Sequence, residues 1–158
     1  GIAMPARLLV ALVGLLAIAS GVAVWQLSLR PPAGDDRRQI ILMVAKLEQA
    51  IEQRRTSTVM RYISRDYHDG YGFDRRMIQR LVLQAARQAQ PIDLVVQLGS
   101  ISLEGDLATV HVEADYAVGA PVGAGESTHV SGELLLRRER GGWKVLRSDG
   151  WQGPALEP

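Results

Sequence analysis

The spacing of apolar residues changes along this chain, and the first stretch is apolar throughout. An uncharged run extends from Leu8 to Leu29, with Arg7 before it and Arg30 after it. At about 1.5 Å per residue, such a run is long enough to cross the ~30 Å hydrocarbon core of a bilayer. Trp25 lies where an interfacial anchor is expected. The pattern predicts a transmembrane anchor over residues 8–29.

A secretory signal is the main alternative for this segment. Residues 8–16 have the composition of a signal-peptide core, and Ala17-Ile18-Ala19 has the small-x-small pattern of a cleavage site. The apolar character continues beyond that site, which favours an uncleaved anchor. A cleaved, secreted form and a buried soluble helix stay open as alternatives.

The segment also sets the expected domain boundaries and location. We expect residues 1–3 to be an expression remnant before Met4, 4–30 the anchor or signal, 31–35 a linker, 36–151 the folded domain and 152–158 a flexible tail. A bacterial inner-membrane protein with a periplasmic domain is the preferred topology. Basic residues soon after the run, such as Arg37 and Arg38, favour the opposite, cytoplasmic orientation.

A helical period begins after the linker. Ile40, Val44, Leu47 and Ile51 recur at the spacing of one helix face. Asp36 is the expected cap of this helix, with Gln39 as its capping-box partner. A short helix starting at Thr56 or Ser57 and a third helix over 74–89, capped by Asp74 and ended by Pro91, are expected to follow.

From Ile92 the period changes to two, which is typical of strands. Strands are predicted over 92–103, 109–116, 128–140 and 143–148, with a tight Gly141-Gly142 turn before the last. Helices followed by meandering strands indicate an α+β domain, with three helices packed on one face of a curved four-stranded antiparallel sheet.

The order of these elements resembles a known superfamily. The features that carry the resemblance are the helix over 40–55, the segment 62–67, the helix over 74–89 and Gly142-Trp143-Lys144-Val145. Together they are similar to the nuclear-transport-factor-2-like proteins, which include ketosteroid isomerases and polyketide cyclases. The resemblance implies a cone of bent strands around helices, with a pocket at its mouth, and it does not imply an activity.

Composition excludes several function classes. The net charge of +1 is too even for a nucleic-acid binder, and the absence of cysteine excludes disulfides, thiolate metal sites and a catalytic thiol. Charge is nevertheless segregated: residues 35–90 hold 11 basic and 7 acidic residues (+4), whereas 91–151 hold 5 basic and 9 acidic residues (−4). The helical half could therefore face anionic headgroups or an acidic partner, although solvated arginines on helices are common.

The first candidate site is the polar segment Asp66-Tyr67-His68-Asp69 with Tyr71. Asp66 or His68 could act as a general acid or base, or the histidine and its flanking carboxylates could ligate a metal if further ligands came from elsewhere in the chain. The preferred interpretation is a turn in which the aspartates bind the backbone and the tyrosines cover the mouth of the cone.

The second candidate site lies on the last strand. If Trp143 and Val145 face inwards, strict alternation places Arg147, Asp149 and Trp151 on the same face. Asp149 is then a candidate base and Arg147 a candidate anion ligand, although a simple ion pair between them is preferred. The predicted pocket lining comprises Tyr67, Tyr71, Arg147, Asp149, Trp151 and Tyr116. The trio of groups that an isomerase needs cannot be assigned to particular residues.

A third polar set lies on the predicted outer face of the sheet. It comprises His111, Glu113, Asp115, His129 and Glu133. Histidines with carboxylates can bind a metal, but no metal or cofactor is expected, because the spacing of a metal site is not met. The resemblance implies that this face pairs two subunits.

The sequence is compatible with three functions. The preferred one is a non-enzymatic, membrane-tethered binding or assembly module for a small apolar ligand or a partner's segment. The second is an isomerase- or cyclase-type enzyme with Asp149, Asp66 or His68 as base. The third is an accessory subunit of a larger membrane complex, with no nucleic acid involved in any of them.

Overall fold

The structure is a computed structural model that describes residues 34–88 and 90–153. The predicted anchor, most of the linker and most of the tail lie outside these residues. Within the described part, no helix has both the length and the apolar character needed to cross a membrane.

The three predicted helices are present. They are α3 (Gly34–Glu52), α4 (Thr56–Arg61) and α5 (Arg75–Ala86). Asp74 caps α5 as predicted, because its carboxylate accepts a hydrogen bond of 2.8 Å from the backbone N–H of Met77. The predicted capping box of the first helix is wrong: α3 already includes Gly34, and Asp36 in its first turn binds Arg138 at 2.7 Å.

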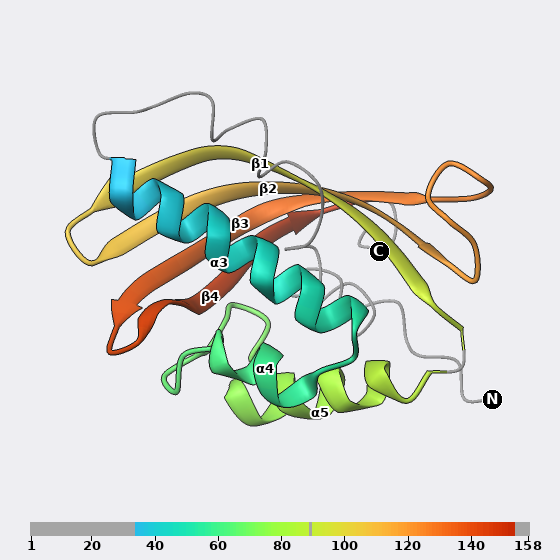
Figure 1. Ribbon diagram of the computed structural model, residues 1–158, viewed down its shortest axis with the longest axis horizontal. Coiled ribbons are helices and arrows are strands. Elements are labelled where there is room, and N and C mark those ends of the chain that lie inside the picture. The colour runs from blue at the N-terminus through green and yellow to red at the C-terminus, as the bar shows by residue number, and fades with distance from the viewer. Residues whose placement is uncertain (1–33, 89, 154–158) are drawn as a thin grey trace.

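The four strands form one antiparallel sheet in the order of the chain. They are β1 (Ile92–Glu104), β2 (Leu107–Val118), β3 (Thr128–Glu139) and β4 (Gly142–Gln152). The strands curve over α3, which crosses one face of the sheet, and α4 and α5 lie farther from the sheet (Figure 1). This arrangement confirms the predicted α+β class with three helices and a four-stranded antiparallel sheet.

Strand β4 departs from regular alternation twice. Leu136 pairs with Val145, but Leu135 pairs with Arg147, so one extra residue lies between the two pairs. A second extra residue follows Asp149, at Gly150, whose φ of 66° suits glycine. As a result, the buried positions of β4 are spaced two, then three, then three residues apart: Trp143, Val145, Ser148 and Trp151.

These bulges make one prediction wrong. Arg147 and Asp149 do not share a face with Trp151, since each bulge shifts the strand by one residue and reverses which side chains face the core. Ser148 takes the inward position instead and is 4% exposed. Its hydroxyl accepts a hydrogen bond of 2.7 Å from the indole Nε1 of Trp151.

The indole of Trp151 packs directly on Gly132 in β3. A Cβ atom at position 132 would lie only 2.5 Å from Cδ2 of Trp151. Both residues are buried, so the absence of a side chain at Gly132 is what admits the ring.

We expect Gly132→Ala to destabilise the domain by about 1–3 kcal/mol, because the ring must move to avoid the added methyl group. Urea unfolding measures the effect. Gly125→Ala is the control, since a Cβ atom there meets nothing within 4 Å, and its unfolding midpoint should stay close to that of the wild type. Equal midpoints for the two variants would contradict the packing role of Gly132.

Candidate functional site

The polar segment after α4 is attached along the edge of β4. Ile63 pairs with Val145 in a parallel bridge. The backbone N–H of Val145 donates to the carbonyl of Tyr62 at 2.8 Å, and its carbonyl accepts from the N–H of Ser64 at 2.9 Å. Farther along, the N–H of His68 donates to the carbonyl of Leu146 at 3.3 Å. The segment therefore extends the sheet beyond β4 and brings its side chains onto the β3–β4 hairpin.

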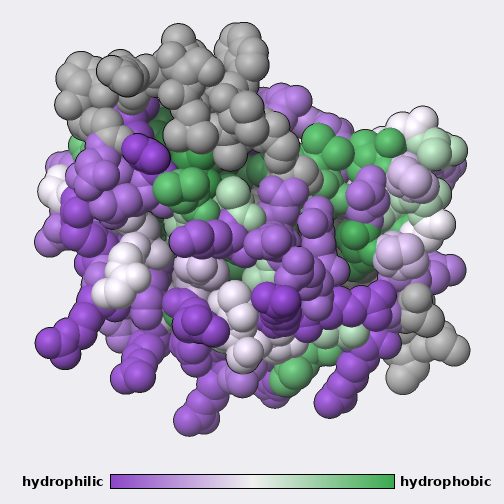
Figure 2. All heavy atoms as spheres, in the orientation of Figure 1, coloured by the Kyte–Doolittle hydropathy of each residue, from purple (hydrophilic) through white to green (hydrophobic). Residues whose placement is uncertain are grey.

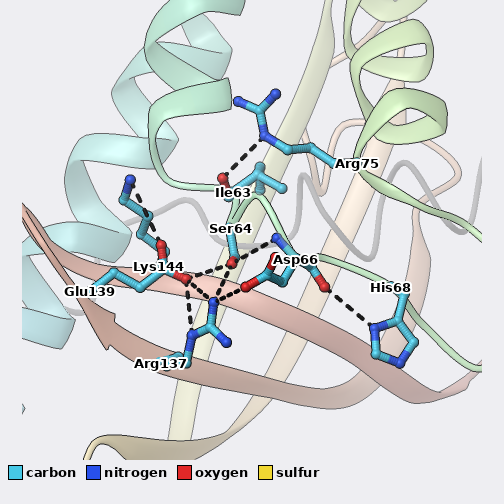
Figure 3. A network of polar contacts seen from close by, with 8 residues as sticks. All are labelled: Ile63, Ser64, Asp66, His68, Arg75, Arg137, Glu139 and Lys144. Atoms are coloured by element: carbon cyan, nitrogen blue, oxygen red, sulfur yellow. Dashed lines mark hydrogen bonds and ion pairs between the residues drawn. The ribbon is translucent and has the colours of Figure 1, made fainter.

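A polar network fixes the start of this segment (Figure 3). The hydroxyl of Ser64 donates to Oε1 of Glu139 at 2.5 Å. Nη2 of Arg137 donates to the same carboxylate at 2.6 Å, to the Ser64 hydroxyl at 3.1 Å and to Oδ2 of Asp66 at 2.6 Å. Asp66, a candidate base, is thus held by an arginine at an exposed position.

The network also sets the ionisation of Glu139. Partial burial acts to raise the pKa of Glu139, but the hydrogen bonds from Ser64 and Arg137 outweigh burial and lower the pKa below its usual range. The ionised carboxylate is therefore the form that the fold stabilises.

The next turn is organised around Asp69. Its Oδ1 accepts from the backbone N–H groups of Tyr71 and Phe73, each at 3.0 Å, and its Oδ2 accepts from the hydroxyl of Tyr67 at 2.8 Å. Tyr67 is 3% exposed, and burial together with the hydrogen bond to Asp69 raises its pKa well above the usual value. This pattern agrees with the preferred interpretation of the segment as a structural turn.

The other candidate bases also have partners. Asp149 accepts a hydrogen bond of 2.7 Å from the backbone N–H of Gly70 and pairs with Arg147. His68 is exposed, and its Nδ1 lies 3.3 Å from the carbonyl oxygen of Asp66. The preferred ion pair between Arg147 and Asp149 is confirmed.

The predicted pocket residues are divided between the core and the surface. Tyr116 and Trp151 are buried at 4% and 6% exposure, whereas Tyr71 is 47% exposed and its hydroxyl accepts from the backbone N–H of Trp151 at 3.1 Å. Tyr71 thus contacts the backbone of Trp151, and Arg147 pairs with Asp149.

A cavity of about 130 Å³ lies elsewhere, where the ends of α3 and α5 meet the start of β1. Figure 2 shows apolar side chains gathered on the side of the molecule where Figure 1 places the beginning of β1. The lining is mostly aliphatic: Ala50, Ile51, Glu52, Arg54, Thr56, Val59, Val82, Ala85, Ala86, Gln90, Pro91, Ile92 and Leu94. The six residues predicted to line a pocket are not among them.

Arg54 is the basic residue of this lining, and its backbone is unusual. Its φ of 55° is the only positive value at a non-glycine residue in the described part of the chain. The N–H groups of Arg54 and Arg55 donate to the carbonyls of Ile51 and Ala50 at 2.9 and 2.7 Å, which is the Schellman ending of a helix. Glycine is usual at this position, yet here an arginine donates from Nη1 to the carbonyl of Ala86 at 3.4 Å, joining the ends of α3 and α5.

Sequence reasoning missed this cavity because its lining comes from four separate segments. The residues are individually ordinary core or surface types, so no local motif marks them. The one available signal was the lack of a glycine after the first helix, at a place where the chain must turn sharply.

The polar set on the outer face of the sheet is paired across and along strands. His129 lies opposite Asp115, with 2.9 Å between Nδ1 and Oδ1, and His111 lies opposite Glu133 and 3.9 Å from Glu113. Among the described residues, no group of three or more histidines and carboxylates is placed to hold a metal ion.

The buried Tyr67–Asp69 pair predicts a loss of stability in alkali. The folded pKa of Tyr67 is raised above the unfolded value of about 10. The protonated phenol of Tyr67 therefore contributes fully to the free energy of unfolding below pH ~10, and this contribution falls as the pH rises further. Tyr67→Phe should lower the free energy of unfolding by about 1–3 kcal/mol at neutral pH, because Asp69 loses a partner. Above pH ~10 the stability of this variant should fall less than that of the wild type. Urea unfolding at a series of pH values tests this, and Tyr62→Phe, which keeps the pair, should behave as the wild type.

The Glu139 network predicts the opposite pH dependence. Because its folded pKa is lowered, Glu139 stabilises the fold above the unfolded value of about 4.3, and this contribution is lost as the pH falls through the folded value. Glu139→Gln should lower stability at neutral pH and flatten the loss between about pH 5 and 3. The control is Glu126→Gln in an exposed loop. Parallel acid denaturation curves for the wild type and Glu139→Gln would refute this role.

Comparison with known proteins identifies the fold. No protein-family model and no curated protein matches the chain.

A dehydratase candidate of the nuclear-transport-factor-2-like (NTF2-like) family from Streptomyces avermitilis superposes with a TM-score of 0.60 at 19% identity, covering 75% of this chain and 95% of the other. An NTF2-like protein with a cystatin-like fold from Novosphingobium aromaticivorans has a TM-score of 0.57 at 18% identity, covering 79% and 86%. An NTF2-like protein of unknown function from Pseudomonas putida has a TM-score of 0.57 at 17% identity, covering 73% and 84%. At these identities the likeness establishes the fold alone: the domain has the NTF2-like fold.

Proposed function

We propose that this protein is a non-enzymatic, membrane-tethered binding module whose cavity between α3, α5 and β1 holds a small apolar ligand. The observation that carries the proposal is the aliphatic lining of that cavity, with only a few polar groups, including Arg54, Thr56 and Gln90. Pockets for small molecules characteristically combine an apolar wall with a few polar groups that fix orientation.

The size of the cavity limits the ligand. Sites for drug-sized molecules usually measure about 300–1,000 Å³, whereas a cavity of about 150 Å³ accommodates benzene. With about 130 Å³, this cavity suits a single ring or a short alkyl chain. This size argues against the alternative of an isomerase or cyclase with a large polycyclic substrate.

The state of the carboxylates supports a binding role over catalysis. A general base needs a free lone pair aimed at the substrate and commonly has a shifted pKa. Asp149 is occupied by Gly70 and Arg147, and Asp66 is occupied by Arg137. Neither carboxylate belongs to the cavity lining, whose acidic residue is Glu52, an exposed residue.

Tethering is the part of the proposal that rests on the sequence. The uncharged run over residues 8–29 supplies the anchor, and a periplasmic domain is the topology that we propose for it. A domain held at a bilayer is well placed to take up small apolar molecules, which concentrate there.

Ligand binding can be tested with benzyl alcohol as the probe. We expect the full-length protein in lipid nanodiscs, labelled at isoleucine, leucine and valine methyl groups, to show saturable shifts at the lining residues Val59, Val82 and Ile92. Ala85→Phe should fill the cavity and weaken binding at least about tenfold, because the added ring occupies the space of the ligand. Shifts that never saturate, or that survive Ala85→Phe unchanged, would contradict the proposal.

Gln84→Phe is the matched control for this experiment. It introduces the same ring on the same helix, but at an exposed residue outside the lining. Binding to Gln84→Phe should equal that of the wild type, and its loss would show that a ring on α5 disturbs the helix rather than the cavity.

A further inference from the structure

The outer side of α5 carries a basic stripe that the proposed ligand site does not use. Arg76, Arg80, Leu83 and Arg87 follow one another at intervals of four, three and four residues, which places them on one face of the helix. All four are exposed. The buried residues Ile78, Leu81 and Val82 occupy the opposite face, against the core.

Further arginines lie near both ends of this stripe. Arg54 reaches the carbonyl of Ala86 at the end of α5, and Arg75 at its beginning donates from Nη2 to the carbonyl of Met60 in α4 at 3.1 Å. The two contacts show that α4 runs antiparallel beside α5. The exposed arginines flanking the stripe are Arg54, Arg55, Arg61 and Arg65.

The acidic residues in and around α4 and α5 do not neutralise the arginines of these helices. Residues 54–87 hold eight arginines and only three acidic residues, and none of the three pairs with an arginine of α4 or α5: Asp66 binds Arg137 at 2.6 Å, whereas Asp69 and Asp74 accept hydrogen bonds of 2.8 Å from neutral groups. The ion pairs of the described residues include none of the exposed arginines of α4 and α5. The positive charge of the layer is therefore available to an external anion.

The shape of the layer favours a surface over a small ligand. Figure 1 places α4 and α5 farthest from the sheet, and Figure 2 shows hydrophilic side chains projecting along that edge of the molecule. Leu83 lies within the stripe and is 37% exposed, which offers an apolar contact between the charges. Clustered basic side chains close to a bilayer are attracted to anionic headgroups, and the exposed leucine adds an apolar contact at the same surface.

From these observations we infer that the α5 stripe, Arg76, Arg80, Leu83 and Arg87, docks on the anionic headgroups of a phospholipid bilayer. A bilayer is the partner indicated by the chain itself, because the uncharged run of residues 8–29 ends only a few residues before α3. Each arginine near an anionic surface strengthens attachment by a factor of about five. Three arginines together then contribute about 100-fold, which is enough to decide how the domain lies on the membrane.

The absence of cysteine allows a direct test with the full chain. Leu83→Cys is labelled with the fluorophore NBD, and the protein is incorporated into vesicles of phosphatidylcholine alone or with 30% phosphatidylglycerol. We expect blue-shifted, brighter emission only with phosphatidylglycerol. The signal should revert in 1 M NaCl, where the Debye length falls to about 3 Å. Thr109→Cys, exposed on the outer face of the sheet, is the reference position and should not respond.

A charge variant completes the test. Arg76→Gln, Arg80→Gln and Arg87→Gln combined in the Leu83→Cys protein should abolish the response, with circular dichroism to verify folding. Equal emission in both lipids, an equal response at position 109, or a response that survives the triple substitution would each overturn the inference. A response to soluble polyglutamate but not to phosphatidylglycerol would also overturn it and identify an acidic protein segment as the partner. The readout does not involve the cavity, so its outcome is separate from that of the ligand titration.

Discussion

The attachment of residues 62–68 to the edge of β4 is the constraint on which the helical layer depends. Val145 uses both of its backbone groups in this contact, with Tyr62 and Ser64 as partners. Because α4 precedes the segment and α5 follows it, the pairing holds both helices at a fixed place relative to the sheet. It also covers a strand edge that would otherwise present unpaired backbone groups. The Ser64–Glu139–Arg137 network then prevents the segment from sliding along the strand, since its hydrogen bonds require one register.

The same attachment explains why the carboxylates of the polar segment are bound by hydrogen-bond donors. Carboxylates brought close to a buried strand lose hydration, and they are stable there only if donors replace the lost water. Asp69 obtains two backbone N–H groups and a phenol, and Asp149 obtains a backbone N–H group and a guanidinium. These bonds replace the lost hydration and stabilise the fold. The cavity lies outside this polar segment, in a region where aliphatic side chains meet without filling the space between helix ends.

The helices and strands could be predicted from the sequence, whereas the cavity could not. Periods of 3.6 and two residues identified three helices and four strands, because burial on one face dictates both patterns. Alternation failed in β4, where bulges move Ser148 inwards and Arg147 outwards. Gly150 was a visible sign of the second bulge, whereas nothing in the residues around Leu146 distinguishes the first. The cavity could not be predicted, since it depends on how closely α5 approaches β1, and that distance is set by packing across the whole core.

The paired bulges of β4 have a consequence for how such a strand can change in evolution. At each bulge β4 has one residue more than the facing part of β3, so the side chains beyond it point to the opposite face from the one that strict alternation would give. Deleting Leu146 or Gly150 would remove one bulge and leave Trp151 facing the core, because the pairs on either side of the extra residue keep their partners. Length variation here should therefore occur one residue at a time at these two bulges, and an alignment of homologues should place its gaps in β4 there and not within the regular pairs.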